Sequence, residues 1–165
     1  VFIGMPGTGK STVSKIISNL GFDMVELDEY IETKHQMTLF QLIDKYGDEG
    51  FKKIEEDAIM SVTFDKPKVI STGGSVIYSK KGMEYLKSEN NWIIYLNTSF
   101  IKLVERTDNF TNRGIVFNGK SRKELFEERH LLYQKYCDFE IMTKNLTANE
   151  ISNIITNSIF MKRII

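Results

Sequence analysis

Gly4-Met5-Pro6-Gly7-Thr8-Gly9-Lys10-Ser11 directly follows an apolar run at residues 1–3. The stretch matches the pattern G-x-x-x-x-G-K-[ST] at every required position. Its glycines let consecutive backbone N–H groups turn inward around phosphate oxygens, in conformations that a side chain with a Cβ resists. A strand before it and an amphipathic helix over residues 12–19 after it complete the expected context. The stretch predicts a phosphate loop that binds a nucleoside triphosphate, with a chance glycine-rich turn as the alternative.

The positions of this loop have different expected tasks. Lys10 supplies a cation for the outer phosphates, and Ser11 offers a hydroxyl to Mg²⁺. The helix that starts here directs its positive N-terminal end at the same anion. We expect ATP to contact Gly7, Thr8, Gly9, Lys10, Ser11 and Thr12. The loop alone does not say where the phosphate goes, because kinases, motors, switches and transporters share it.

The composition limits the class of protein. The 165 residues contain no Pro- or Ser-rich linker, which predicts a single domain over residues 1–165. The 22 Lys and Arg residues balance 22 Asp and Glu residues, so no bulk charge favours nucleic acid or an anionic membrane. One cysteine, Cys137, permits no internal disulfide and suits a reducing compartment. We expect a cytoplasmic monomer with a small-molecule partner.

The chain begins inside an apolar run, with no charged n-region and no long apolar segment. This pattern supports neither a signal peptide nor a membrane span. We expect a few N-terminal residues to be missing from the sequence.

Short β-type runs alternate with longer helical patterns along the chain. This alternation predicts an α/β fold, a three-layer sandwich in which helices flank a five-stranded parallel sheet. Capping boxes at Thr38-x-x-Gln41, Ser121-x-x-Glu124 and Thr147-x-x-Glu150 mark helix starts, and Gly21 and Gly47 fit helix ends. The expected strands cover residues 1–3, 22–27, 68–72, 92–96 and 139–142.

Parallel strands joined by helices bind ligands at their carboxyl ends. Besides the phosphate loop, the residues there are Asp28, Gly73-Gly74-Ser75 and Asn97. Strand alternation is expected to place Glu26 and Asp28 on one face, where one carboxylate serves the Mg²⁺ shell and the other orients or deprotonates an attacking alcohol. The alternative for Asp28 is a helix N-cap, and for Gly73 and Gly74 a simple turn.

Three arginines are candidates for phosphate or carboxylate binding, namely Arg106, Arg113 and Arg129. A solvated surface charge is the alternative for each. Arg113 lies in residues 107–121, a stretch rich in Asn and Gly that predicts a mobile lid. Closure of this lid would bring Arg113 to the phosphates and exclude water.

Together these residues resemble the shikimate kinase family, a branch of the nucleoside monophosphate kinase-like P-loop fold. The resemblance covers essentially the whole chain, and no single later motif is as specific as the order of them all. After the phosphate loop, the matching stretches are Leu27-Asp28-x-x-Ile31-Glu32, Gly47-Asp48-x-x-Phe51-Lys52-Lys53-Ile54-Glu55, Thr72-Gly73-Gly74, Glu105-Arg106-Thr107, Asn112-Arg113 and Glu128-Arg129-x-x-Leu132-Tyr133.

The resemblance implies an ATP-dependent kinase that phosphorylates the 3-hydroxyl of shikimate. It implies that acceptor-binding helices lie at about residues 28–62. By the same resemblance, Asp28 acts on the acceptor hydroxyl, while Arg129 and the cation after Phe51, here Lys52, hold its carboxylate. The glycines with Ser75 line the acceptor ring, Arg106 packs on adenine, and Arg113 acts from the lid. The metal ligands are Ser11 and Glu26.

The chain departs from the family pattern mainly on the acceptor side. Lys52 stands where the family has arginine, Ser75 where it has a third glycine, and Arg113-Gly114 where it has Arg-Pro. Glu26 replaces the usual aspartate. Lysine keeps the charge of arginine but loses the fork that binds a carboxylate through two parallel donors. The alternatives are therefore a kinase for another small alcohol, hydroxy acid or nucleotide, or a catalytically silent nucleotide-binding relative.

Overall fold

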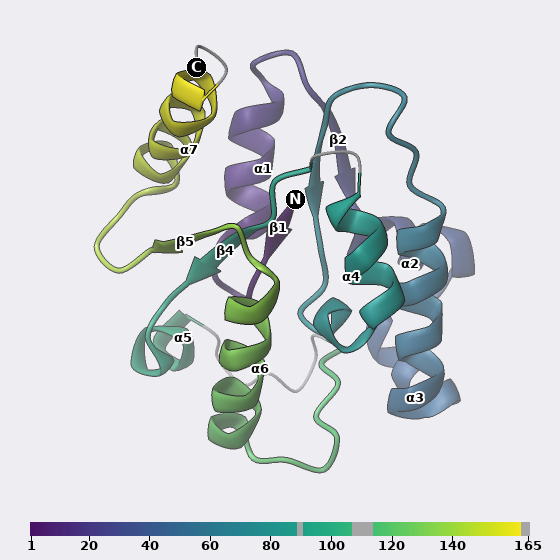
Figure 1. Cartoon of the computed structure of the whole chain (residues 1–165). Coiled ribbons are helices and arrows are strands. Elements are labelled where there is room, and N and C mark those ends of the chain that lie inside the picture. Colours follow the sequence, from purple (N-terminus) through teal and green to yellow (C-terminus); the bar gives the residue numbers. More distant parts are fainter. Residues whose placement is uncertain (89–90, 107–113, 163–165) are drawn as a thin grey trace.

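The computed structural model describes residues 1–88, 91–106 and 114–162 (Figure 1). Its described strands form one parallel sheet in the order β2-β3-β1-β4-β5. The strands are β1 (Phe2–Ile3), β2 (Asp23–Glu26), β3 (Lys68–Ser71), β4 (Ile94–Asn97) and β5 (Phe139–Met142). The prediction of a five-stranded parallel sheet is confirmed, and each strand lies within two residues of its expected bounds.

Helices connect the strands and flank the sheet (Figure 1). They are α1 (Lys10–Ser18), α2 (Leu27–His35), α3 (Leu39–Met60), the 3₁₀ helix η1 (Val76–Tyr78), α4 (Lys80–Lys87), α5 (Phe100–Arg106), α6 (Arg122–Tyr136) and α7 (Ala148–Lys162). The three capping boxes are present, at the starts of α3, α6 and α7. No helix in the described ranges is both long and apolar enough to cross a bilayer.

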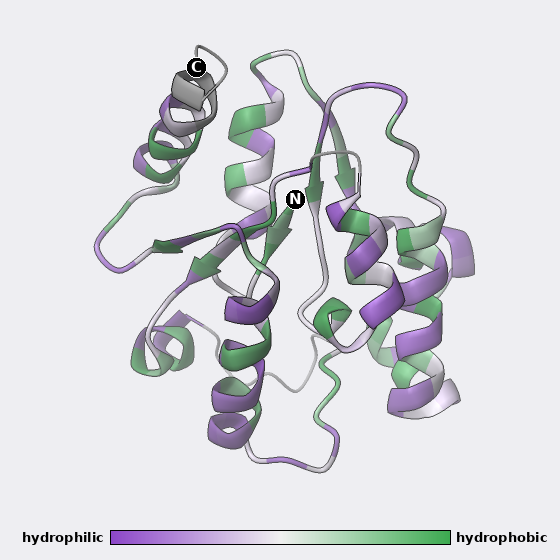
Figure 2. Cartoon of the chain, in the orientation of Figure 1, coloured by the Kyte–Doolittle hydropathy of each residue, from purple (hydrophilic) through white to green (hydrophobic). Residues whose placement is uncertain are grey.

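Alternation along the strands divides the apolar side chains between two cores. Phe2, Val69 and Ile94 pack on one face of the sheet, against residues of α1 and α7. The next residue of each strand packs on the other face, with side chains from α2, α3, α4 and α6. Figure 2 shows hydrophobic colour along the central strands and mixed colours on the helices, as expected for a sheet buried on both faces. The predicted three layers are confirmed.

Gly47 was expected to end a helix, and it does so inside α3. Its backbone angles, φ 67° and ψ 174°, are non-helical. They form a kink between two consecutive helical segments of α3. A residue with a Cβ strongly disfavours this conformation, so glycine permits the kink. Gly21 is the second residue beyond the C-cap of α1, and its φ of 98° also suits glycine.

The start of α2 differs from the expectation. The strand ends at Glu26, and Asp28 lies in the first turn of α2 instead of after an extended Leu27. Leu27 and Ile31 are both buried in one core, and their i, i+4 spacing suits a helix that begins at Leu27. The prediction that Glu26 and Asp28 share a strand face is therefore wrong. The N-cap is Glu26, so the alternative role of Asp28 as the cap is also wrong.

Candidate active site

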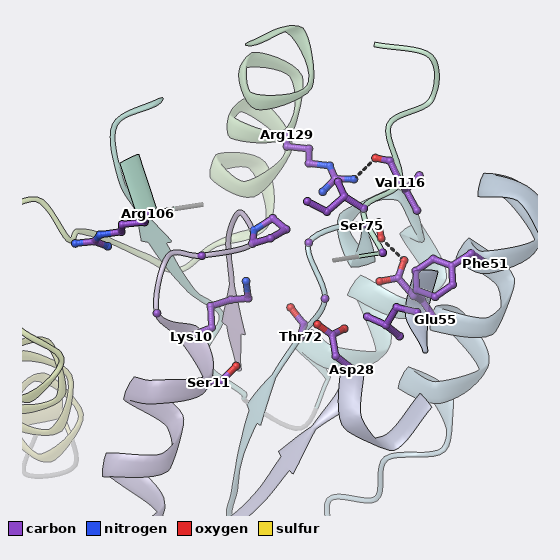
Figure 3. Close-up of a pocket in the computed structure, with 18 of the residues that line it drawn as sticks. Lys10, Ser11, Asp28, Phe51, Glu55, Thr72, Ser75, Arg106, Val116 and Arg129 are labelled. Carbon is purple, nitrogen blue, oxygen red and sulfur yellow. Dashed lines mark hydrogen bonds between the residues drawn. The ribbon is translucent and has the colours of Figure 1, made fainter. Parts of the chain in front are cut away.

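A pocket of about 460 Å³ lies at the carboxyl end of the sheet (Figure 3). One wall is the phosphate loop and the start of α1, and the opposite wall comes from α3, α6 and the turn after β3. The lining residues are 6, 7 and 9–12 in the phosphate loop region, Asp28, Leu39, Phe51 and Glu55, 72–75, Arg106, 114–116 and Arg129. Most of the residues selected from the sequence therefore meet in one cavity.

The phosphate loop is folded to bind an anion. Gly9 is the N-cap of α1 with φ 95°, and no side chain caps the first turn, so its N–H groups stay available to a ligand. Gly4 has φ 146°, and a Cβ there would lie 2.7 Å from the carbonyl oxygen of Leu96. Thr8 turns its hydroxyl away, donating to the carbonyl of Met5 at 2.9 Å. Any contact of Thr8 with a nucleotide would thus be through its backbone.

Lys10 is buried between the phosphate loop and the acidic side of the pocket. Its Nζ donates to the carbonyl oxygens of Gly4 at 2.8 Å and Met5 at 3.1 Å. Burial lowers the pKa of Lys10 to about 8, although the charges of Asp28 and Glu26 oppose this shift. In Figure 3 its ammonium group points into the cavity. Phosphate oxygens would offer this cation stronger acceptors than two neutral carbonyls.

Asp28 faces Lys10 across the floor of the pocket (Figure 3). Burial raises the pKa of Asp28 to about 6, against the opposing charge of Lys10. Such a carboxylate is ionised near neutral pH and is basic enough to accept a proton or a hydrogen bond from an alcohol. The electrostatics thus suit the role expected from the sequence.

The predicted metal ligands, Ser11 and Glu26, have features that suit a cation. The Oε2 atom of Glu26 is buried without a hydrogen-bond partner, and Ser11 is exposed at the start of α1. A buried carboxylate oxygen without a partner is costly unless water or an ion satisfies it. Within the described ranges no three acidic, His or Cys side chains gather as a metal site. A Mg²⁺ ion here would therefore depend on phosphate oxygens and water for most of its ligands.

Glu55 is a site residue that the candidates taken from the sequence did not include. It is buried in α3 and accepts a hydrogen bond from the hydroxyl of Ser75. Burial raises the pKa of Glu55 to about 8, against the Ser75 hydrogen bond, which lowers it. An available clue was its helical spacing from Phe51 and Ile59, which places an acid on an otherwise apolar face.

Gly73 separates the two acids of the pocket. A Cβ at this position would lie 2.5 Å from Oε1 of Glu55 and 2.8 Å from Oδ1 of Asp28. At Gly74, a Cβ would lie 2.8 Å from Nη1 of Arg129 and 2.8 Å from Cδ of Pro6. The two glycines therefore do more than form a simple turn. They let three charged side chains approach the backbone of the pocket wall.

Arg129 has only 1% of its surface exposed. Its Nη2 donates to the carbonyl of Val116 at 2.6 Å, as Figure 3 shows, and its Nε donates to the hydroxyl of Tyr78 at 3.4 Å. No carboxylate in the described part of the chain lies within ion-pair distance of it. Buried cations are normally paired, so an arginine that lines a pocket in this state is suited to an anionic ligand.

The other residues selected from the sequence differ in where they lie relative to the pocket. Lys52 is not among the pocket-lining residues, because its Nζ pairs with Glu49 at 2.6 Å and lies over the ring of Tyr78. Arg106 lines the pocket at its far side, with its guanidinium directed away from Lys10 (Figure 3). Asn97 donates to Glu140 on β5 at 2.6 Å and does not line the pocket. Arg113 and most of the expected lid's first half, residues 107–113, lie outside the described residues.

Comparison with known proteins identifies the family. A family model described as shikimate kinase matches residues 6–160. The chain belongs to the shikimate kinase family. The shikimate kinase of Thermodesulfovibrio yellowstonii is 40% identical over 156 residues, covering 92% of this chain and 89% of its relative. That of Histophilus somni is 32% identical over 164 residues, covering 94% and 93%. The predicted membership of the shikimate kinase family is confirmed.

Solved structures of shikimate kinases share the fold. The enzyme from Acinetobacter baumannii, in complex with shikimate, superposes with a TM-score of 0.87 at 26% identity and covers 98% of this chain and 92% of its own. The enzyme from Aquifex aeolicus gives 0.82 at 25% identity, with coverage of 98% and 96%. Shikimate kinases are ATP-dependent phosphotransferases with an alcohol acceptor, so the predicted P-loop kinase class is also confirmed.

Proposed function

We propose that the protein transfers the γ-phosphate of ATP to the 3-hydroxyl of shikimate. The observation that carries this proposal is the buried Arg129, which lines the same pocket as Asp28 and Lys10 and has no carboxylate partner in the described structure. A small alcohol that carries a carboxylate would satisfy Arg129 and present a hydroxyl to Asp28. The related A. baumannii structure is a complex with shikimate, which supports this choice of acceptor.

The pocket residues divide the reaction between them. Asp28 orients the hydroxyl and accepts its proton as the oxygen attacks the γ-phosphorus and the bond to the β-phosphate oxygen breaks. Lys10 and the N–H groups at the start of α1 stabilise the charge on the transferred group and on the departing ADP. Phosphoryl transfer of this kind depends on positioning and positive charge more than on covalent help from the protein. We propose Arg113 as a further cation for this step, and Arg106 as an adenine contact, as the family resemblance implies.

We propose that Mg²⁺ binds with the nucleotide, where Ser11 would hold it directly and Glu26 would bind its water shell. The buried Glu26 oxygen without a partner supports this assignment. The ion would neutralise charge on the β- and γ-phosphates. No other step depends on it, and the protein side chains alone bind and orient the acceptor.

We also propose a cytoplasmic monomer with one domain over residues 1–165, the range 28–62 serving the acceptor and 107–121 serving as a lid. The balanced charge and the single cysteine support a small-molecule partner in a reducing compartment, without nucleic acid or membrane. Four residues of the range 28–62 line the pocket and support the acceptor assignment: Asp28 in α2, and Leu39, Phe51 and Glu55 in α3.

The direct test measures ADP release with ATP, Mg²⁺ and millimolar shikimate. We expect turnover that needs both substrates, and we expect Asp28→Asn to lose about 10²- to 10⁴-fold in kcat, as for removal of a general base. Nucleotide binding by the same samples serves as the control for folding. If the protein binds ATP but does not phosphorylate shikimate, the acceptor is wrong, and a panel of small alcohols, hydroxy acids and nucleotides would then identify it.

A further inference from the structure

Tyr78 ends the 3₁₀ helix η1, three residues after Ser75, and contacts one cation from α3 and one from α6. The Nζ of Lys52 in α3 lies 5.0 Å from the centre of its ring. The Cζ of Arg129 in α6 lies 5.4 Å from the same centre. An aromatic ring attracts cations at these distances through its negative π face. One side chain thus contacts both cations expected to hold the acceptor carboxylate.

The hydroxyl of Tyr78 fixes the direction of Arg129. It donates to Oε1 of Glu128 at 2.8 Å and accepts from Nε of Arg129 at 3.4 Å. Glu128 also pairs with Lys120, which anchors it. Since Nη2 of Arg129 is held by the carbonyl of Val116, the edge that remains is the one with Nη1 beside Gly74. Gly74 lines the pocket, so the contacts of Tyr78 leave this edge for a ligand.

Lys52 needs such a neighbour more than an arginine would. A lysine binds a carboxylate as a point charge on a flexible stem, so its position must come from surrounding groups. Its other partner, Glu49, has 84% of its side chain exposed, and an ion pair so exposed holds its members weakly. The side chain of Lys52 itself is only 19% exposed. The ring of Tyr78 is a second group beside its ammonium.

We propose that Tyr78 is a positioning residue of the acceptor site, which holds Lys52 and Arg129 together as a pair of cations for one carboxylate. The inference rests on the proposed function and adds a determinant of acceptor specificity to it. Tyr78 itself does not touch the acceptor. An arginine at position 52 would have a planar fork of fixed geometry, whereas the ammonium group of Lys52 must be oriented by its neighbours. Tyr78 supplies this orientation from outside the pocket.

The experiment compares Tyr78→Leu with Tyr78→Phe. Tyr78→Leu removes the ring and the hydroxyl, and we expect the KM for shikimate to rise roughly 5- to 30-fold, the range of a partly desolvated cation–π contact. Tyr78→Phe keeps the ring and should raise this KM less, by about 2- to 5-fold, because the contact of the hydroxyl with Nε of Arg129 is long at 3.4 Å. The KM for ATP and kcat should stay within about twofold in both variants, because Tyr78 acts on the acceptor end alone.

Tyr46→Leu provides a matched control. The Nζ of Lys45 lies 5.0 Å from the centre of the Tyr46 ring, the same distance as in the Lys52–Tyr78 pair. In the described structure it is Tyr78, and not Tyr46, that contacts the pocket-lining Arg129. We expect the KM of Tyr46→Leu for shikimate to match that of the wild type. A rise equal to that in Tyr78→Leu would show that loss of any such pair disturbs the protein, and would overturn the proposal.

A double-mutant cycle with Lys52→Met separates positioning from packing. If Tyr78 acts partly through Lys52, the effect of Tyr78→Leu on the KM should shrink when Lys52 is absent. Fully additive effects, or an unchanged KM in a Tyr78→Leu protein that binds ATP normally, would overturn the proposal. If Tyr78→Leu does not fold, Tyr78→Phe decides alone, since an unchanged KM for shikimate in that variant would show that the Tyr78 hydroxyl does not orient Arg129 and would overturn the proposal. Failure of the proposed function is distinct, because the wild type would then not phosphorylate shikimate at all.

Discussion

At the scale of single residues, the pocket is lined by buried charged side chains that form no ion pair with one another in the described structure. These side chains are Lys10, Asp28, Glu55 and Arg129. Burial lowers the pKa of Lys10 and raises the pKa values of Asp28 and Glu55, which favours the neutral form of each. Desolvation of this kind is typical of active sites, where charged groups take part in chemistry and do not form surface ion pairs. The residues most useful to the reaction are therefore those whose ionised state the free protein stabilises least.

This electrostatic balance predicts a bell-shaped dependence of activity on pH. Asp28 is protonated below its pKa of about 6 and must be ionised to accept the hydroxyl proton, so activity should rise as the pH passes upward through 6. Lys10 loses its charge above its pKa of about 8, so activity should fall beyond it. The measurement is kcat/KM for each substrate as a function of pH. A profile that stays flat across both values would contradict these assignments.

Arg129 should act on the acceptor and little on the nucleotide. Arg129→Ala removes a charge-assisted contact to the acceptor carboxylate, and we expect the KM for shikimate to rise roughly 10- to 100-fold. The KM for ATP should change far less, because the phosphate loop lies on the opposite wall. Steady-state kinetics with each substrate varied in turn gives both values, and equal losses in the two would refute this division of the pocket.

At the scale of elements, the chemistry lies where helices begin or bend. The phosphate loop opens into α1, and Asp28 occupies the first turn of α2 directly after β2. The kink in α3 at Gly47 divides the helix in two, and Phe51 and Glu55 follow the kink. The kink changes the direction of the helix axis. It therefore sets the direction of the second segment, which carries Glu55 to the pocket.

Gly47→Ala should destabilise the protein although the added Cβ would cause no steric clash. A Cβ at Gly47 would meet nothing within 4 Å, so the cost comes from the backbone, whose φ of 67° and ψ of 174° lie in a region used almost only by glycine. We expect a loss of about 1–3 kcal/mol in the free energy of unfolding, measured with denaturant. Asp44→Ala, at an exposed position of the same helix, should stay within about 0.5 kcal/mol. Equal stability of the two variants would count against backbone strain.

At the scale of the whole molecule, the position of the site follows from the order of the strands. β1 lies between β3 and β4, so the chain leaves β1 at the point where successive connections run to opposite sides of the sheet. Ligands of open α/β sheets bind in the crevice at this switch point. The two cores lie on the two faces of the sheet and leave its carboxyl edge for the pocket.

Nucleotide binding should therefore stabilise the entire fold. At a concentration 100 times its Kd, a ligand of the native state adds about 2.7 kcal/mol, which corresponds to a Tm increase of roughly 5–10 °C for a chain of this size. Thermal unfolding with ATP and Mg²⁺ measures the shift, and a chelator should reduce it. Lys10→Ala should lose most of the shift, whereas Lys45→Ala, at an exposed position outside the pocket lining, should retain it. No shift for the wild type at saturating ATP would contradict the phosphate loop assignment.

Much of the fold and part of the site could be predicted from the sequence, because the determining patterns are local. Strand alternation, capping boxes and the phosphate loop each depend on neighbours a few residues apart, and they gave the parallel sheet, the helices and the nucleotide wall. The acceptor wall depends on residues distant in the chain. Glu55 was missed because its environment arises only when α3 packs against Ser75 and Gly73.

The sequence by itself determined that this chain builds a P-loop kinase fold, and it named Lys10, Asp28 and Arg129 as its charged residues. Only the tertiary structure decided what surrounds them. It moved Asp28 from a strand end to the first turn of a helix, left Arg129 buried without a carboxylate partner in the described structure, and placed Lys52 over Tyr78. The physical reason is that burial and the electric field at a side chain depend on every group packed nearby, and most of these groups are far away in the sequence.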